Sequence, residues 1–388
     1  MNTTTGDARR SPRARRAIVL ILAAVLVATG TSVVYLKPSL LSHSPPAKAV
    51  RPTVQSNDYT AAYSFPTPAL GWALVADTTS AAPGFSVFKT TDGARHWKRQ
   101  LVKQPNLVGP GVLMIQFFDP SHGVIAAGVP TAIYRTSDGG THWAQVKTPN
   151  LEFSWFVPVD AAHGWLLGWI GKPVQPLNLF STSDGGDTWI ALPNSLGWAR
   201  AWPGSRNPFL SFRNPREGWF GANAAEPVVY SSADGGVSWQ PHTLPSNLDS
   251  NLCPAGAGVS TWVTLLPGHG VVAIVEYCAQ VEGYTSVDGG ATWQPLASPP
   301  GWNFAYQDSS HWWTMQSGTL WKTSDSGRSW TMVSKQSSDW DYVLHVIDAK
   351  YAWAELFSNA PGLQGGRGLA VTSDGGLHWS QVSAPKPG

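Results

Sequence analysis

The sequence predicts an all-β protein, a seven-bladed β-propeller preceded by a single N-terminal transmembrane helix. Three observations support this prediction: one turn motif occurs seven times, a second turn motif lies upstream of each copy, and an uncharged apolar run lies near the N-terminus. The clearest copy of the first motif reads Thr-Ser-Asp-Gly-Gly-Thr-His-Trp over residues 136–143. Successive motif aspartates are 37 to 54 residues apart, and a period of that size without helical patterning is typical of four-stranded propeller blades.

Each copy of the first motif has a tryptophan five residues after its aspartate and at least one glycine between them. A carboxylate accepts backbone hydrogen bonds in a tight turn, glycine permits positive φ there, and tryptophan returns on the next strand as an apolar anchor. Because one acid recurs in one setting, we expect these aspartates to brace turns rather than to catalyse or bind metal. They are Asp92, Asp138, Asp184, Asp234, Asp288, Asp325 and Asp374.

A second motif, Gly-Trp or a related pair, lies upstream of each turn. In five units an Asp or Asn stands five residues before the second member of the pair: Asp119, Asp160, Asn214, Asp308 and Asp348. This is a turn signal between the first two strands of each unit. We therefore expect four strands in each unit. In the second unit they are expected over residues 112–118, 124–128, 132–135 and 142–147.

These two motifs carry a family resemblance. The first resembles the Asp-box, or BNR repeat, of sialidases, sortilins and related propellers. Its combination with the upstream motif, over about residues 57–384, is most similar to the photosystem II assembly/stability factor family and its relatives outside photosynthesis. The resemblance implies a non-enzymatic propeller that assists assembly or stability of a membrane or envelope complex. It does not name the ligand, because this fold hosts many activities.

The N-terminal part of the chain predicts a membrane anchor. Residues 1–16 form a basic cytoplasmic segment with five arginines, residues 17–36 are uncharged and apolar, residues 37–58 form a Pro-rich tether, and residues 59–384 form the propeller. About 20 apolar residues suffice to span a bilayer, and the arginines place the N-terminus in the cytoplasm. We therefore expect a single-pass protein of the cell membrane with an extracytoplasmic propeller. A cleaved signal peptide, which would give a secreted protein, is the alternative.

Charge and motif content narrow the function. The first 16 residues carry a net charge of +4 and the whole chain +2, so the remainder carries about −2. A nearly neutral ring argues against a nucleic-acid partner. No catalytic triad, phosphate loop or metal motif is visible, so the sequence predicts no catalytic residue, no metal and no cofactor. Phe212-Arg213-Asn214-Pro215 resembles the arginine- and proline-containing signature of sialidases, but it lies in the fourth unit at the position of the first turn.

Only two cysteines occur, Cys253 and Cys278, both in the fifth unit. An even pair in an exported domain predicts a disulfide. Two separate buried thiols are the alternative.

The candidate binding residues lie on the side of the ring opposite the Asp-boxes, where loops are free to vary and carry function. We expect aromatic and arginine side chains there to surround the mouth of the central channel, since these residue types are enriched at binding hot spots. The partner is expected to be a membrane or envelope protein, or a glycan. Carbohydrate binding, or sialidase-like glycoside hydrolysis, is the alternative function, and tryptophans that only plug the channel are the alternative role. The predicted residues are Trp155, Trp198, Arg200, Trp202, Arg206, Trp262, Trp302 and Trp340.

Overall fold

The structure is a computed structural model. It describes residues 59–77, 84–103, 112–128, 131–151, 153–169, 177–192, 210–246, 258–278, 280–301, 303–336, 340–358 and 367–385. The predicted anchor, tether and first 16 residues lie outside these ranges, so the single-pass topology stays a prediction. Within the described ranges there is no helix with the length and apolarity needed to cross a membrane.

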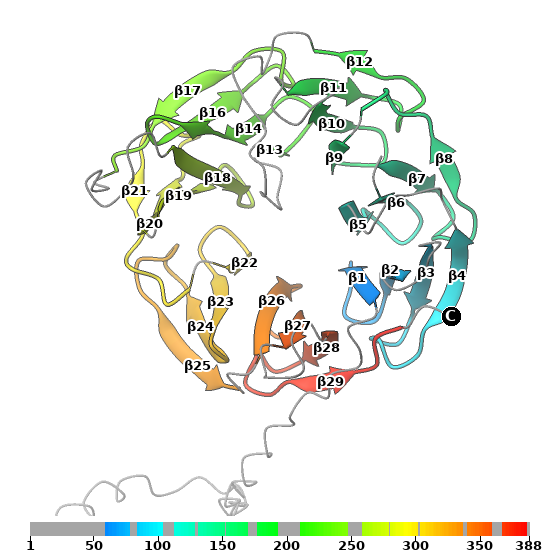
Figure 1. Ribbon diagram of the computed structural model, residues 1–388. Coiled ribbons are helices and arrows are strands. Elements are labelled where there is room, and N and C mark those ends of the chain that lie inside the picture. The colour runs from blue at the N-terminus through cyan, green and yellow to red at the C-terminus, as the bar shows by residue number, and fades with distance from the viewer. Residues whose placement is uncertain are drawn as a thin grey trace, which may run out of the picture. The chain divides into compact units, whose positions relative to one another are not determined.

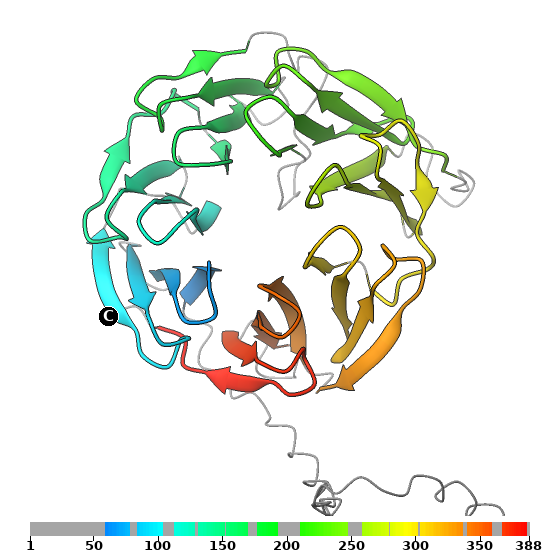
Figure 2. The same ribbon diagram turned by 180° about the vertical axis from the view of Figure 1, so that it is seen from behind.

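The described residues form seven antiparallel sheets arranged in a ring, which confirms the seven-bladed propeller (Figure 1; Figure 2 shows the ring from behind). Blade 1 comprises β1 (Tyr59–Ser64), β2 (Gly71–Asp77), β3 (Phe85–Thr90) and β4 (Lys98–Lys103). Blade 2 comprises β5 (Val112–Phe117), β6 (Gly123–Gly128), β7 (Ala132–Thr136) and β8 (Ala144–Val146). Blade 3 comprises β9 (Phe153–Pro158), β10 (Gly164–Trp169), β11 (Asn178–Thr182) and β12 (Ile190–Ala191). Blades 4 and 5 comprise β13 (Leu210–Phe212), β14 (Gly218–Gly221), β16 (Val228–Ser232), β17 (Gln240–Thr243); and β15 (Asn223–Ala224), β18 (Val259–Leu265), β19 (Val271–Tyr277), β20 (Gln280–Ser286), β21 (Gln294–Pro295). Blades 6 and 7 comprise β22 (Phe304–Tyr306), β23 (Trp312–Gln316), β24 (Thr319–Thr323), β25 (Thr331–Lys335); and β26 (Trp340–Val346), β27 (Ala352–Ser358), β28 (Arg367–Thr372), β29 (Ser380–Val382).

The strands of blade 2 show why the sequence folds this way. The second strand, β6, is buried along its whole length because its two faces pack against neighbouring blades, and its sequence Gly-Val-Ile-Ala-Ala-Gly carries no charge. The outermost strand, β8, exposes two of its three residues. The four observed strands start and end within two residues of the predicted ones.

The upstream motif forms the turn between the first two strands of a blade. In blade 2 the Asp119 Oδ1 atom accepts the backbone N–H groups of Ser121 at 2.6 Å and His122 at 2.8 Å. The Gly139 N–H of the Asp-box turn donates to the Ser121 carbonyl at 2.8 Å. The two turns of a blade therefore lie side by side, and together they make one rim of the ring, which we call the Asp-box rim.

Blades 1 and 7 close the ring without sharing a strand among the described residues. Tyr63 and Trp353 pack edge to face with ring centroids 5.6 Å apart, inside an apolar cluster drawn from both blades. The Trp97 indole N–H of blade 1 donates to the Ser383 carbonyl after blade 7 at 2.7 Å.

The expectation of four strands in every blade is wrong for blade 5. The short strand β15, which belongs to the blade 4 stretch of the chain, pairs antiparallel with β18, the first of blade 5's own four strands. Thr261 holds the two blades together, because its N–H donates to the Ala222 carbonyl at 2.9 Å and its hydroxyl donates to the Val228 carbonyl at 2.8 Å. Gly221 makes this approach possible: a Cβ atom there would lie 2.1 Å from the Thr261 carbonyl oxygen.

Cys278 follows β19 with a positive φ of 56° and is not a free thiol. Cys253 lies outside the described residues, so the predicted pairing of the two cysteines stays a prediction.

Candidate functional site

The Asp-box of blade 2 is a closed hydrogen-bond network. The buried Thr136 hydroxyl donates to Asp138 Oδ1 at 2.9 Å and accepts the Gly140 N–H at 3.0 Å. Asp138 Oδ1 also accepts the His142 N–H at 2.9 Å, and its Oδ2 atom meets His142 Nδ1 at 2.6 Å. The carboxylate is thus engaged on both oxygens by its own turn.

The same network recurs in all seven Asp-boxes. The residue four after the aspartate supplies both a backbone and a side-chain donor; it is His96, His142, Thr188, Ser238, Thr292, Ser329 or His378. These donors lower the pKa of Asp138 and Asp288 to about 2. Partial burial opposes the shift at Asp234, but the hydrogen bonds from Ser238 still lower its pKa. Ionised carboxylates with occupied oxygens are poorly suited to proton transfer.

The Asp-box also serves as the contact between blades. The Trp72 indole N–H of blade 1 donates to the Gly139 carbonyl of blade 2 at 3.0 Å. Lys89 lies 4.9 Å from the Trp72 ring centroid and donates to the same carbonyl at 3.2 Å. A cation over an aromatic face and a charge-assisted hydrogen bond thus join blades 1 and 2.

Related cations join two other pairs of blades. Arg135 of blade 2 donates to the Asp184 and Gly185 carbonyls of blade 3 at 3.0 and 3.1 Å. Lys322 of blade 6 lies 3.3 Å from the Trp313 ring centroid and near Asp374 of blade 7. Burial lowers the pKa of Lys322 to about 8, although the charge of Asp374 acts in the opposite direction.

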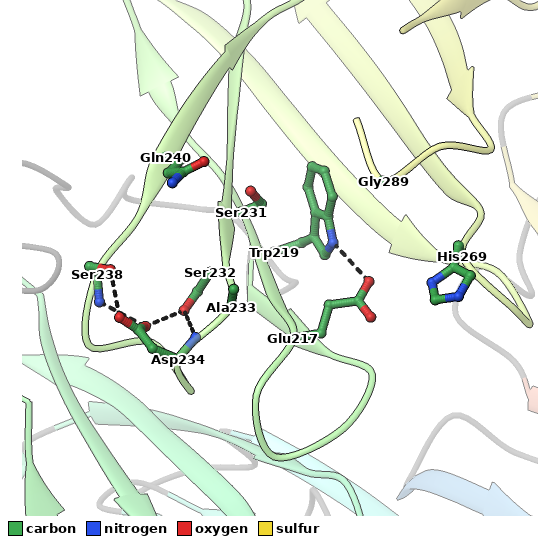
Figure 3. A pocket seen from close by; sticks show the side chains of 10 residues that line it. All are labelled: Glu217, Trp219, Ser231, Ser232, Ala233, Asp234, Ser238, Gln240, His269 and Gly289. Carbon is green, nitrogen blue, oxygen red and sulfur yellow. Dashed lines mark hydrogen bonds between the residues drawn. The ribbon is translucent and has the colours of Figure 1, made fainter. Parts of the chain in front are cut away.

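Blades 4 and 5 meet differently, around a pocket of about 270 Å³ on the Asp-box rim (Figure 3). The Trp219 indole nitrogen points toward Glu217 of its own blade, with 3.5 Å between Nε1 and Oε1. His242 packs on the Trp219 ring with centroids 5.3 Å apart, and its Nε2 atom is hydrogen bonded to the Ser231 hydroxyl at 2.8 Å. The lining residues are Glu217, Trp219, Ser231, Ser232, Ala233, Asp234, Ser238, Gln240, His269 and Gly289.

Arg213, the arginine of the sialidase-like tetrapeptide, bonds to both blades beside this pocket. Its Nε atom donates to Glu217 Oε1 at 2.9 Å, and its terminal nitrogens donate to the carbonyls of Leu266 and Gly270 of blade 5. The guanidinium thus fixes one blade to the next.

The structure places only part of the predicted binding set. Trp155 is 9% exposed and packs edge to face against Trp169, and Trp262 is half-buried against the same apolar cluster between blades 3 and 4. Trp340 contributes its backbone to the start of β26. The remaining residues lie outside the described ranges, so the binding set stays a prediction: Trp198, Arg200, Trp202, Arg206 and Trp302.

Sequence reasoning missed the pocket. Its partial signal is Ser231, which stands directly before the Asp-box hydroxyl residue, where blades 1, 2 and 6 carry Lys89, Arg135 and Lys322 but blades 3, 5 and 7 also lack a cation. An alignment of the seven units would have shown this difference, but not that it accompanies a pocket. Among the described residues, the pocket included, no group of three or more His, Cys, Asp or Glu side chains could hold a metal ion.

Seven blades with seven Asp-box turns define the class: the chain is an Asp-box β-propeller. It is 25% identical over 298 residues to the photosystem II assembly lipoprotein Ycf48 of Synechococcus sp. (strain CC9902), covering 69% of this chain and 74% of that protein. It is 31% identical over 144 residues to the chloroplastic photosystem II stability/assembly factor HCF136 of Oryza sativa subsp. japonica, covering 31% of this chain and 32% of that protein. These relatives confirm the predicted resemblance to photosystem II assembly/stability factors.

A solved structure, YCF48 bound to a D1 peptide, has the same fold. It superposes with a TM-score of 0.51 at 16% identity, covering 83% of this chain and 99% of that chain. At that identity the likeness supports the propeller fold alone. No protein-family model matches the chain.

Proposed function

We propose that this chain is a non-enzymatic, membrane-tethered propeller that binds a protein of the membrane or cell envelope outside the cytoplasm and assists its assembly. The observation that carries the proposal is the similarity over 298 residues to a protein named as an assembly lipoprotein. A peptide segment is the ligand class that we propose, by analogy with a structural neighbour named as YCF48 bound to a D1 peptide.

The geometry of the rim agrees with a binding role. Each Asp-box carboxylate is occupied by its own turn, as Asp138 is by Thr136 and His142. Arg213 is engaged with Glu217 and two backbone carbonyls. The Asp-box carboxylates and Arg213 therefore serve the fold, which favours a binding role over hydrolysis at these residues.

The membrane tether is the part of the proposal that rests on sequence. The apolar run over residues 17–36 and its preceding arginines support it. The predicted aromatic and arginine set around Trp302 remains one candidate contact surface on the side opposite the Asp-box rim.

The test is affinity capture with the full-length protein from membranes of its own host, with bound proteins identified by mass spectrometry. A glycan array probed with the same preparation is the counterpart experiment. The proposal predicts a membrane or envelope protein enriched over a tag-only control and no glycan signal. Saturable glycan binding, or release of sugar from a glycan, without an enriched protein would overturn it.

A further inference from the structure

The pocket between blades 4 and 5 lies at a position where three of the seven blades hold a cationic side chain, while blades 3, 5 and 7 carry Ser181, Thr285 and Val371. Lys89, Arg135 and Lys322 each precede the hydroxyl residue of their Asp-box and reach toward the next blade. Ser231 holds this position in blade 4, and its hydroxyl is bonded to His242 within the same blade. The short serine side chain does not extend to blade 5 as the longer ones extend to their neighbours.

The surroundings of the Asp-box glycine show the difference directly. A Cβ atom on Gly139 would lie 2.8 Å from Lys89 Nζ, and one on Gly185 would lie 2.8 Å from an Arg135 nitrogen. At Gly289, the corresponding glycine of blade 5, no described atom comes within 4 Å of that position. The glycine that accepts a cation at other junctions therefore borders the pocket here.

Acceptor groups line this pocket (Figure 3). Glu217 uses Oε1 for Arg213, and within the described part of the chain no group is bonded to its Oε2 atom. Asp234 adds a second carboxylate, whose pKa is lowered by its turn despite partial burial. Arg213 is a nearby positive charge, but Glu217 and two carbonyls use its donors. Arg216, on the same turn, is exposed to solvent.

The net negative charge of blade 5 also favours a cation in the pocket. Residues 247–300 contain four acids and no lysine or arginine. The described acids of this stretch are Glu276, Glu282 and Asp288, and Asp288 directly precedes the lining residue Gly289. A cationic group entering the pocket thus meets acceptors without a lysine or arginine from blade 5.

Two exposed valines flank the lining residues in sequence. Val237 is 59% exposed and directly precedes Ser238, and Val287 is 66% exposed and lies two residues before Gly289. At about 270 Å³ the pocket is smaller than typical small-molecule sites. It therefore fits one side chain of a segment whose apolar neighbours cover the valines.

We propose that this pocket binds a lysine or arginine side chain from an exposed segment of a protein partner. The ligand cation contacts the Glu217 carboxylate and the Gly289 carbonyl, as Lys89 contacts Gly139 in blade 2. Because Trp219 is buried under His242, the indole face does not take part in binding. This inference rests on the proposed function, and it names the chemistry of the segment that the platform recognises.

The test uses full-length protein with ¹⁵N-labelled tryptophan and two blocked peptides, acetyl-Val-Lys-Val-amide and its norleucine counterpart. The Trp219 indole signal, assigned with a Trp219→Phe variant, reports binding because its N–H points to Glu217. The lysine peptide, and an arginine version of it, should shift this signal saturably, whereas the norleucine peptide should not.

Ser231→Lys places an internal ammonium as in blade 1 and should weaken peptide binding at least tenfold. Ser181→Lys, the matched change in blade 3 where Trp165 already donates to Gly235, should leave binding unchanged.

Glu217→Gln provides a second variant and should weaken binding of the lysine peptide about tenfold, with an unchanged tryptophan spectrum elsewhere. Equal shifts from the lysine and norleucine peptides, or full binding by a folded Ser231→Lys or Glu217→Gln variant, would overturn the inference. The proposed function is judged separately by capture. If wild type and Ser231→Lys capture a partner equally, the proposed function stands and the proposed role of the pocket is wrong. If the pocket binds the lysine peptide but the protein captures no partner, the pocket's preference for a cation is supported and the proposed function is wrong.

Discussion

Replacing Thr136 by valine tests the bracing role of the Asp-box with little change in shape. The Thr136 hydroxyl donates to Asp138 at 2.9 Å and accepts the buried Gly140 N–H at 3.0 Å. Valine fills the same volume and offers neither bond. The Gly140 N–H then lies buried without its acceptor. The carbonyl of the same residue keeps its hydrogen bond from the Trp143 indole N–H.

The magnitude follows from that orphaned donor. A buried N–H without a partner costs about 1–3 kcal/mol, whereas the exposed Asp138 carboxylate can exchange the lost hydroxyl for water at little cost. A domain of 150–250 residues loses about 2–4 °C in melting temperature for each kcal/mol, and a larger ring loses less. Thr136→Val should therefore lower the melting temperature by about 1–5 °C. Loss of the hydroxyl should also raise the pKa of Asp138 from its depressed value of about 2.

Thermal unfolding followed by tryptophan fluorescence measures this effect, and Thr136→Ser is the matched control. Serine keeps the hydroxyl and loses only a methyl group, so its melting temperature should stay close to wild type. The folded Thr136→Val protein should retain partner binding. If valine and serine destabilise equally, or if valine abolishes binding at an unchanged melting temperature, the bracing argument is wrong.

Three further outcomes are expected. A protein that retains the Ala17–Leu36 anchor will sediment with membranes and expose a C-terminal reporter outside the cytoplasm; recovery of a soluble form beginning after that segment would reject the anchor. Protein unfolded without reductant after isolation from its own compartment should show no free thiol at Cys253 or Cys278, and two reactive thiols would exclude the disulfide. The double change Trp302→Ala and Trp340→Ala should weaken partner capture at least tenfold without lowering the melting temperature, so unchanged capture would remove these residues from the contact surface.

The turns could be predicted from sequence because their bonds are local. The Asp138 network extends only from Thr136 to His142, and the Asp119 turn only to His122, so residue order alone specifies both. Seven copies of such turns determine the number of blades and the order of the strands. The burial of the second strand β6 follows from its uncharged apolar run.

Contacts between blades could not be predicted in this way. Trp72 bonds to Gly139, 67 residues further along the chain, and no short pattern links the two. The fifth strand of blade 5 depends on a close approach of Gly221 to Thr261, which only the packed ring brings together. The same holds for the pocket, because Ser231 differs from Lys89 in sequence but its effect depends on the neighbouring blade.

The central claim, that this ring acts by binding a protein, is tested most directly by photo-crosslinking in the native host. A photoreactive amino acid is placed singly at Val237, Val287 and Trp302, with Ile190 on the outer strand β12 as the control. Val237, Val287 and Ile190 are similarly exposed, at 59%, 66% and 61%, so a difference among them reports the surface rather than accessibility. We expect a discrete adduct with one membrane or envelope protein from Val237 and Val287 and none from Ile190. Absence of a discrete protein adduct at every position, or the same adduct pattern at Ile190, would contradict it.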